Sequence, residues 1–553
     1  MNLNEFIFNL LKQSYLNETG LASQKRKWAK ESGLMVSNSQ IITGYRKLVA
    51  QQQIRPDKKF ERLLRLKKIR SLSGIVPLAV LTKPYLCPGK CIYCPTQKGM
   101  PKSYLNDEPA VMRAKMANFD PYLQVTRRLN QFKTIGHTTD KVELIIMGGT
   151  FSSLPKNYQV WFIANCFVAC NQTAPLVISI PKFRERNLVK RKTRSDNIGP
   201  RSLISFEITR MLTEQKINET AKHRIIGLTL ETRPDQINIK EIKFMRQLGC
   251  TRVEIGVQSI YDSVLKKVNR GHTIKETIKA TQLLKDAGFK VCYHLMPNLP
   301  DSNLKKDFQM FQEIFTNKNF MPDMIKIYPC VVLYQAKLYD WYKKEEFKPY
   351  TDKQLIDLLI EIKKIVPEWI RINRLGRDIP VTNIAAGNKI SNIRQVLQQK
   401  LKEKNLQCQC IRCREIRARK ISNLKLEIRN YRASGGNEYF LQYVDKNNRL
   451  YALLRLRIPS QIYTKKKHFL PVLQNSAIIR ELHTYGEALP IAKEDKQASQ
   501  HHGLGKKLVK KAEEIVRSLG IKKIVVIAGV GARKYYKKLG YQLEDSYMIK
   551  NLF

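Results

Sequence analysis

The feature that most restricts the fold is a repeated alternation of apolar, β-like segments with helical stretches between residues 71 and 330. Strands separated by helical crossovers favour a parallel sheet with right-handed connections, and five or six such units fit a partial β/α barrel. The active sites of such barrels lie at the carboxyl ends of the strands. The segments expected to form strands are 74–81, 142–147, 225–230, 252–257, 289–295 and 324–328.

Residues suited to chemistry follow these expected strands one after another. A cysteine triplet follows the first strand, Gly148-Gly149 the second, Glu231 the third and Gln258 the fourth, and His294 closes the fifth. Two glycines at a strand end let the backbone approach a ligand closely, and a plain turn is the alternative. Glu231 and Gln258 suit the binding of a cofactor or a substrate, and a structural salt bridge is the alternative for these side chains.

The first cysteine cluster reads Cys87-Pro-Gly-Lys-Cys91-Ile-Tyr-Cys94. Three thiolates on one short loop suit three irons of a 4Fe-4S cluster and leave the fourth iron open, whereas zinc normally requires a fourth protein ligand. The spacing, with an aromatic residue before the last cysteine, resembles the signature of radical S-adenosyl-L-methionine (SAM) enzymes. That resemblance implies that the open iron binds SAM and that SAM is cleaved to a radical. A zinc site or a chance pattern is the alternative.

A second cluster, Cys408-Gln-Cys410-Ile-Arg-Cys413, lies between basic segments. Three soft ligands this close favour a structural zinc ion with a fourth ligand from elsewhere in the fold, and the alternative is three incidental thiols on a basic loop. The other five of the 11 cysteines are scattered and are expected to be buried apolar residues. An odd number of cysteines without a secretory signal argues against disulfides and for a reducing, cytoplasmic compartment.

From about residue 426 the pattern changes to antiparallel strands, followed by Gln500-His-His-Gly503-Leu504-Gly505-Lys506 at the start of a helix. A Q-x-x-G-x-G loop at that position offers backbone N–H groups to a pyrophosphate, and the helix dipole favours the anion. The order of strand, glycine loop, helix, strand and then YYKKLGY resembles the acetyl-CoA-binding half of GNAT acetyltransferases. A generic surface turn is the alternative.

The chain carries 99 Lys and Arg against 47 Asp and Glu, a formal net charge of +52. Such an excess favours a nucleic-acid partner, because Lys and Arg displace counterions from phosphates, and a Lys-rich genome is the plain alternative. Residues 1–70 alone hold 15 Lys and Arg against 5 Asp and Glu, with cations beside Trp28 and Phe60. Cations interleaved with aromatics suit phosphates and splayed bases. The alternative is a solvated helix face over core aromatics.

A radical SAM motif followed by a GNAT motif resembles the catalytic-subunit family of Elongator and its single-chain bacterial and archaeal relatives. The similarity runs over nearly the whole chain and includes the segments RSLSGIVPLAVLTKP, KSYLNDEPAVMRA, DKVELIIMGGTF, GLTLETRPD, RVEIGVQS, RELHTYG, QHHGLG and GARKYYKKLGY. It implies a tRNA carboxymethyluridine synthase, in which a SAM-derived radical and acetyl-CoA form 5-carboxymethyluridine at the wobble uridine of tRNA anticodons.

The resemblance also implies roles for single residues. Cys87, Cys91 and Cys94 would ligate the 4Fe-4S cluster, while Lys141 and Tyr536 would act at acetyl-CoA, Lys141 from the radical SAM domain and Tyr536 at the thioester. The other residues that would bind acetyl-CoA are Glu481, Leu482, His483 and Thr484 along a strand and Gln500, Gly503, Leu504, Gly505 and Lys506 in the pyrophosphate loop.

The sequence thus predicts an α/β protein with a basic helical tRNA-binding region over 1–70 and a radical SAM partial barrel over 71–330. A linker with the zinc motif over 331–425 would join it to a mixed α/β GNAT domain over 426–553. Expected partners are the tRNA anticodon stem-loop, acetyl-CoA and an electron donor, with no membrane span, no signal peptide and no required partner subunit. The alternatives are acetyl transfer to a lysine or an RNA amine, with a structural cluster, and a tRNA-binding scaffold.

Overall fold

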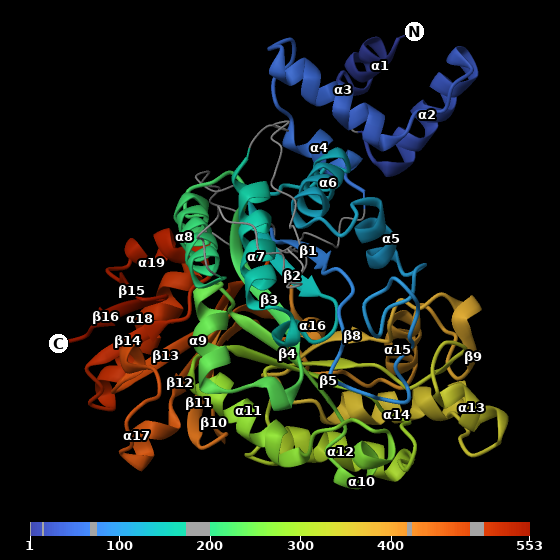
Figure 1. Ribbon diagram of the computed structural model, residues 1–553. Helices are drawn as coiled ribbons and strands as arrows, with labels where there is room; N and C mark the ends of the chain where they lie inside the picture. The colour runs from blue at the N-terminus through green and yellow to red at the C-terminus, as the bar shows by residue number, and fades with distance from the viewer. Residues whose placement is uncertain (1, 14–15, 67–73, 173–199, 417–422, 487–502) are drawn as a thin grey trace, which may run out of the picture.

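A computed structural model describes residues 2–13, 16–66, 74–172, 200–416, 423–486 and 503–553. Figure 1 shows a helical N-terminal part, a central α/β part and a C-terminal part built on a second sheet. Within the described ranges, no helix combines the length and the apolar character that a bilayer crossing requires. The predicted mixed α/β class is confirmed.

The N-terminal part is a small helical bundle with its own apolar core. Its helices are α1 (Leu3–Leu11), α2 (Glu18–Ser32), α3 (Asn38–Ala50) and α4 (Lys58–Leu64). Trp28 packs on Phe6 with ring centroids 5.5 Å apart, and Phe60 packs on Tyr45 at 5.2 Å. Because Trp28 and Phe60 are buried in this core, the expectation that they stack on bases is wrong, and both are core aromatics, as the alternative had it.

The central part is built on a seven-stranded sheet in which neighbouring strands follow one another along the chain and all pairs are parallel. Its strands are β1 (Val76–Leu81), β2 (Lys141–Met147), β3 (Arg224–Thr232), β4 (Arg252–Gln258), β5 (Lys290–Leu295), β6 (Met324–Ile327) and β8 (Arg371–Leu375). The two edge strands β1 and β8 do not pair with each other. The sheet is therefore a partial barrel, as predicted.

Helices that share the apolar core of this sheet cover its outer face (Figure 1). They are α6 (Pro121–Thr134), α7 (Lys156–Asn171), α8 (Pro200–Asn218), α9 (Ile239–Gln247), α11 (Ile274–Asp286), α12 (Leu304–Thr316), α14 (Asp352–Ile365) and α15 (Ile393–Glu403). The other helices of the central part are α5 (Pro109–Met116), α10 (Asp262–Lys267), α13 (Leu338–Lys343) and α16 (Ile411–Arg414). The N-terminal part attaches to the end of α6, where Arg46 Nη1 donates to Lys133 O at 2.6 Å and Arg65 Nε donates to Gly136 O at 2.9 Å.

The sheet continues beyond residue 330, into the segment expected to be a linker. β8 and its preceding helix α14 form a seventh β/α unit, and β7 (Val332–Leu333) pairs with β9 (Ile384–Ala386) beside it. The linker interpretation of 331–425 is therefore wrong for this stretch. β8 escaped notice because Arg371, Asn373 and Arg374 line a polar cavity inside the barrel, so the segment lacks the apolar run of a buried parallel strand.

The C-terminal part holds a second seven-stranded sheet in the order β10-β11-β12-β13-β14-β16-β15. Its elements are β10 (Lys425–Ala433), β11 (Gly436–Val444), β12 (Leu450–Ile458), α17 (Ser460–Thr464), β13 (Ser476–Thr484), α18 (Leu504–Ser518), β14 (Lys523–Val526), α19 (Arg533–Lys537), β15 (Gln542–Glu544) and β16 (Tyr547–Asn551). The four strands from β10 to β13 pair antiparallel, whereas β13 and β14 pair parallel.

The C-terminal part packs directly on the central barrel through buried ion pairs. Arg480 of β13 donates to Asp323 at 2.5 Å and to Glu438 at 2.9 Å, and Arg457 of β12 donates to Asp286 at 2.6 Å. All five side chains are almost fully buried. Since breaking a buried pair is costly, these contacts hold the two sheets in a defined relative position.

Candidate functional site

One cavity of about 1000 Å³ connects the cysteine loop, the barrel interior and the C-terminal sheet. Side chains from both ends of the barrel strands line it, and strand β13 of the C-terminal sheet closes one side. The lining residues that bear on chemistry are Cys87, Cys91, Cys94, Gly149, Glu231, Arg233, Glu254, Gln258, Arg270, His294, Lys326, Arg371, Glu481, Leu482, His483 and Tyr485. The barrel centre is thus hollow and polar, unlike the packed apolar centre of a complete β/α barrel.

The predicted cysteine loop follows β1 and brings its three thiols to this cavity. The Cys87 sulfur accepts from Gly89 N–H at 3.4 Å, and the backbone N–H of Ile92 donates to Val268 O at 3.1 Å, which anchors the loop to the segment after α10. A hydrogen bond from the Cys94 thiol, helped by the Arg270 guanidinium, lowers the pKa of Cys91 to about 4. A ligand thiolate at neutral pH is the form that binds iron.

Two further observations fit a multi-iron cluster at this loop. In the described chain, Cys87, Cys91 and Cys94 do not form a group as tight as a single ion requires. A Cβ atom at Gly89 would collide with the Arg233 guanidinium, whose buried Nη1 has no hydrogen-bond partner among the described residues. An unpaired donor of the described residues therefore remains beside the loop for an anionic ligand, and only glycine fits next to it.

The residues predicted at the next strand ends also reach this region. Gly148 and Gly149 have φ values of +131° and +97°, which favour glycine, and Gly149 lines the cavity. Gln258 has a left-handed φ of +69°, and its buried Oε1 lacks a partner among the described residues. Non-glycine residues in such strained conformations cluster at functional sites. Glu231 accepts a hydrogen bond from Tyr104 Oη at 3.0 Å.

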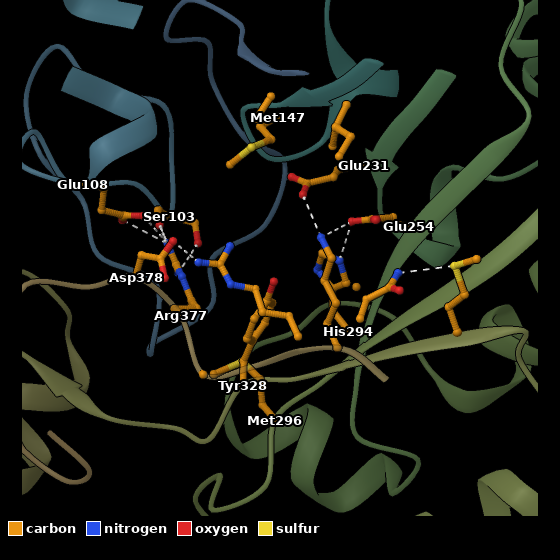
Figure 2. A pocket seen from close by; sticks show the side chains of 18 of the residues that line it. Ser103, Glu108, Met147, Glu231, Glu254, His294, Met296, Tyr328, Arg377 and Asp378 are labelled. Atoms are coloured by element: carbon orange, nitrogen blue, oxygen red, sulfur yellow. Dashed lines mark hydrogen bonds and ion pairs between the residues drawn. The ribbon is translucent and has the colours of Figure 1, made fainter. Parts of the chain in front are cut away.

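A network of charged side chains inside the barrel was missed from the sequence. Glu254 is 1% exposed, accepts from His294 Nε2 at 3.0 Å and pairs with Lys326, which also lies 3.7 Å from Glu231. Figure 2 shows that the side chains of Glu231, Glu254 and His294 point toward one another inside the cavity. Burial raises the pKa of Glu254, but Lys326 and His294 outweigh it and hold that pKa well below its usual range. The sequence signal that could have revealed this network is a charged residue inside an otherwise apolar strand, Glu254 in β4 and Lys326 in β6.

The second cysteine triplet forms a tight group at the edge of the barrel. The sulfurs of Cys408, Cys410 and Cys413 all lie within 4.8 Å of one another, a spacing suited to a single ion, and Lys363 Nζ lies 3.6 Å from Cys413 Sγ. Hydrogen bonds from Cys408 and Cys413 lower the pKa of Cys410 well below its usual value. Among the described residues no fourth His, Cys, Asp or Glu joins this group.

The C-terminal sheet opens at the predicted pyrophosphate loop. Pairing between β13 and β14 ends at Ile479 and Val526, whereas β13 continues to Thr484 paired with β12 on its other edge. The start of α18 lies beside the opening: Gly503, with a φ of +67°, precedes the helix, and a Cβ atom at Gly505 would lie 3.8 Å from Leu482, 3.9 Å from Thr484 and 2.9 Å from Tyr535 Oη. Lys506 is exposed. Gln500 lies outside the described residues.

Strand β13 presents its predicted residues to two different sides. Leu482 and Thr484 lie against Gly505, whereas Glu481 and His483 face the barrel. Glu481 accepts from Arg455 at 2.8 Å and from Lys290 at 3.4 Å.

The two barrel-facing side chains of β13 have shifted pKa values with different causes. Burial raises the pKa of Glu481, but Lys290 and Arg455 outweigh it and lower the pKa to about 2. Burial lowers the pKa of His483 to about 4, so its imidazole is neutral at physiological pH. β13 is therefore a wall shared by the glycine-loop site and the barrel cavity.

Tyr536 and Lys141, the two residues expected to act at acetyl-CoA, lie near the contact between the sheets. Tyr536 is buried in α19 between Tyr535 and Tyr541, and burial raises its pKa above the usual value. Lys141 begins β2, at the opposite end from the cysteine loop, and burial lowers its pKa. Its neighbour in the sheet, Arg224, packs against Gly531 just before α19.

Family models match both halves of the chain. The Radical SAM superfamily matches residues 202–312, the Radical_SAM C-terminal domain 322–403 and the Acetyltransferase (GNAT) family 477–541. The second of these ranges includes β8, in agreement with the seventh strand of the barrel.

Relatives resemble the chain over most of its length. It is 44% identical over 507 residues to a tRNA uridine(34) acetyltransferase of Methanocaldococcus infernus, covering 89% of this chain and 88% of that protein. It is 39% identical to Elongator complex protein 3 of Schizosaccharomyces pombe, covering 88% and 87%. The solved structure of the archaeal Elp3 of Methanocaldococcus infernus with N-terminus deletion (1–46) matches with a TM-score of 0.70 and 41% identity, over 87% of this chain and 100% of that chain.

Proposed function

Because the chain belongs to the family of the tRNA uridine(34) acetyltransferases and Elongator complex protein 3, we propose that it modifies the wobble uridine of tRNA. The product would be 5-carboxymethyluridine, formed with a SAM-derived radical and acetyl-CoA. The observation that carries this proposal is the single cavity that joins the cysteine loop to β13 of the GNAT-like sheet. If the radical SAM site and the acetyl-CoA site catalysed two unrelated reactions, they would not need to share strand β13 as a wall.

Cys87, Cys91 and Cys94 would hold a 4Fe-4S cluster, which supplies the electron that converts SAM to a carbon radical. Gly148 and Gly149 leave the backbone free to approach the methionine end of SAM, and Glu231 and Gln258 would orient the rest of it. The walls of the barrel would limit the access of bulk water to a reactive species.

Acetyl-CoA would lie in the opening between β13 and β14. The backbone at Gly503, Leu504 and Gly505 would bind the pyrophosphate of acetyl-CoA at the positive end of α18, with Lys506 at its side. The part of acetyl-CoA between the pyrophosphate and the thioester would lie along Leu482 and Thr484. Tyr536 would contact the thioester, and Lys141 would reach it from the barrel across the short distance that Arg224 and Gly531 bridge.

The tRNA anticodon stem-loop would be held by its phosphates. Arg26, Lys27 and Lys30 lie exposed along α2, and phosphate contacts of this kind require no sequence-specific pockets. An external electron donor is needed to reduce the cluster. A cytoplasmic, reducing location suits the cluster and the free cysteines, and the chain itself provides the sites for the reaction without a partner subunit.

We retain the proposed division of the chain at residues 70, 330 and 425, with one change. Residues 331–425 would extend the barrel by β8 before they reach the motif of Cys408, Cys410 and Cys413, which would bind a structural zinc ion. The tight sulfur group supports zinc, and Arg412 and Glu415 of the same loop line the cavity. Zinc would thus shape one rim of the site.

The test is a reconstituted reaction with reduced cluster, SAM, acetyl-CoA and unmodified tRNA, followed by mass spectrometry of the digested nucleosides. Carboxymethyluridine should form with the wild type and be absent with Cys91→Ala, while Cys170→Ala, a buried cysteine on α7, should keep the activity. Product from Cys91→Ala would overturn the proposal. An acetylated RNA amine or lysine in place of carboxymethyluridine would favour simple acetyl transfer with a structural cluster.

A further inference from the structure

A buried guanidinium lies directly against the cysteine loop. Arg270, in the segment after α10, is 6% exposed. Its Nη1 donates to Cys91 Sγ at 3.6 Å, and its Nη2 donates to Gly256 O at 2.5 Å. The second hydrogen bond fixes the side chain to β4 and aims the positive charge at the sulfur.

Among the described residues, the Cys91 sulfur is the group that can balance the positive charge of Arg270. In the described part of the chain, no carboxylate lies within ion-pair distance of its guanidinium, whereas Arg233, which bonds the neighbouring Gly271 O at 3.1 Å, pairs with Asp235 at 2.9 Å. A buried cation is costly unless an anion compensates it. Among the described residues, the anionic group that Arg270 contacts is the Cys91 thiolate, so the positive charge of Arg270 would compensate the group that Cys91 binds.

We infer that Arg270 is the counter-cation of the cluster held by Cys91 and its neighbours and sets the reduction potential of that cluster. This inference rests on the proposed cluster site. Reduction adds one negative charge to the cluster, and a fixed cation beside a ligand sulfur stabilises that charge strongly in a low-dielectric interior. Hydrogen bonds to ligand sulfurs act in the same direction. Arg270 therefore raises the potential and makes the cluster accessible to a milder electron donor.

Variants of Arg270 separate the charge from the hydrogen bond. Arg270→Lys keeps the charge, Arg270→Gln keeps an N–H donor without the charge, and Arg270→Met keeps neither. His272→Gln is the matched control, because His272 lies in the same segment and its Nε2 meets the same Gly256 O at 3.3 Å without contacting a sulfur. Burial and the nearby Arg270 lower the pKa of His272, so this control removes no charge.

The measurement is a potentiometric titration of the reconstituted cluster, monitored by electron paramagnetic resonance in the absence of SAM. The potential should fall in the order wild type, Lys, Gln and Met. For Met the equilibrium constant for reduction should drop at least tenfold, which is about 59 mV for one electron. His272→Gln should retain the wild-type potential. If Arg270→Met does not retain its cluster, the difference between the Lys and Gln variants decides the question.

Equal potentials in wild type, Lys and Gln would overturn the inference and assign Arg270 a purely structural role. An equal fall in His272→Gln would do the same, because it would trace the effect to the Gly256 anchor. If the Arg270 variants keep the wild-type reduction potential but bind SAM more weakly, Arg270 contacts SAM and does not set the potential of the cluster. If the wild type assembles no 4Fe-4S cluster, the proposed function itself fails, and that result is visible in the iron content before any titration.

Discussion

Replacing Arg480 by methionine should destabilise the contact between the two sheets more than any surface substitution. Arg480 is 2% exposed and makes five charge-assisted hydrogen bonds. Two go to Asp323 at 2.5 and 2.8 Å, two to Glu438 at 2.9 and 3.2 Å and one to Phe289 O at 2.8 Å. Arg480 thus links β13 to the segments that precede β5 and β6.

The magnitude follows from what the substitution leaves behind. Burial raises the pKa of Asp323, but Arg480, Lys285 and Arg455 outweigh it and hold that pKa below its usual range. When Arg480 is removed, Arg455 remains 3.6 Å from the Asp323 carboxylate, so the buried group stays charged but loses its closest partner. Leaving one buried charge without its partner costs about 3–5 kcal/mol. With an unfolding entropy of about 2.1 cal/mol/K per residue, the unfolding temperature of a 553-residue chain that unfolds as one unit should fall by about 3–4 °C.

The assay is urea denaturation at fixed ionic strength, paired with scanning calorimetry. Arg429→Met is the matched control: Arg429 also bonds two carboxylates, Glu368 at 2.8 Å and Glu427 at 2.9 Å, but it is 44% exposed. An exposed pair contributes only about 0–1 kcal/mol. A loss below about 1 kcal/mol for Arg480→Met, or equal losses for the two variants, would refute the assignment of the interface energy to this buried network.

Three further changes probe the sites separately. Gly148→Ala would place a Cβ atom against Thr82 at a φ of +131°, so SAM binding by the reconstituted protein should weaken in calorimetry while acetyl-CoA binding persists. Gly505→Ala would put a Cβ atom 2.9 Å from Tyr535 Oη, and the dissociation constant for acetyl-CoA should rise roughly tenfold with SAM binding unchanged. The pKa of Glu481 is about 2, so its ionisation stabilises the fold above pH 4.5, and this stabilisation is lost as the pH falls toward 2. Glu481→Gln should weaken the dependence of the free energy of unfolding on pH between pH 4.5 and 2. If wild type and variant show the same dependence, Glu481 does not stabilise the fold in this way.

Much of the fold and half of the site could be predicted from local patterns. Apolar runs predicted the first six barrel strands to within about two residues, because buried parallel strands carry such runs. The cysteine and glycine motifs were visible because their residues are close in the sequence. β8 and the pairing of Glu254 with Lys326 were not visible. Their polar side chains face a cavity that exists only once the barrel has closed around it, so no local pattern could separate them from solvated residues.

A β-bulge explains why β13 serves two sites and why its residues could not be sorted from the sequence. The register of β12 and β13 shifts so that Arg455 lies opposite Glu481 and the next residue, Leu456, lies opposite Ile479. Arg480 therefore has no opposite residue in β12. Before the bulge, Ile479 packs in the core of the C-terminal sheet. At the bulge, Arg480 and Glu481 both point to the barrel, although neighbours in a regular strand point to opposite faces. A strand without this bulge would direct only one of these two side chains to the barrel. The extra residue therefore supplies the interface anchor and the cavity carboxylate from adjacent positions.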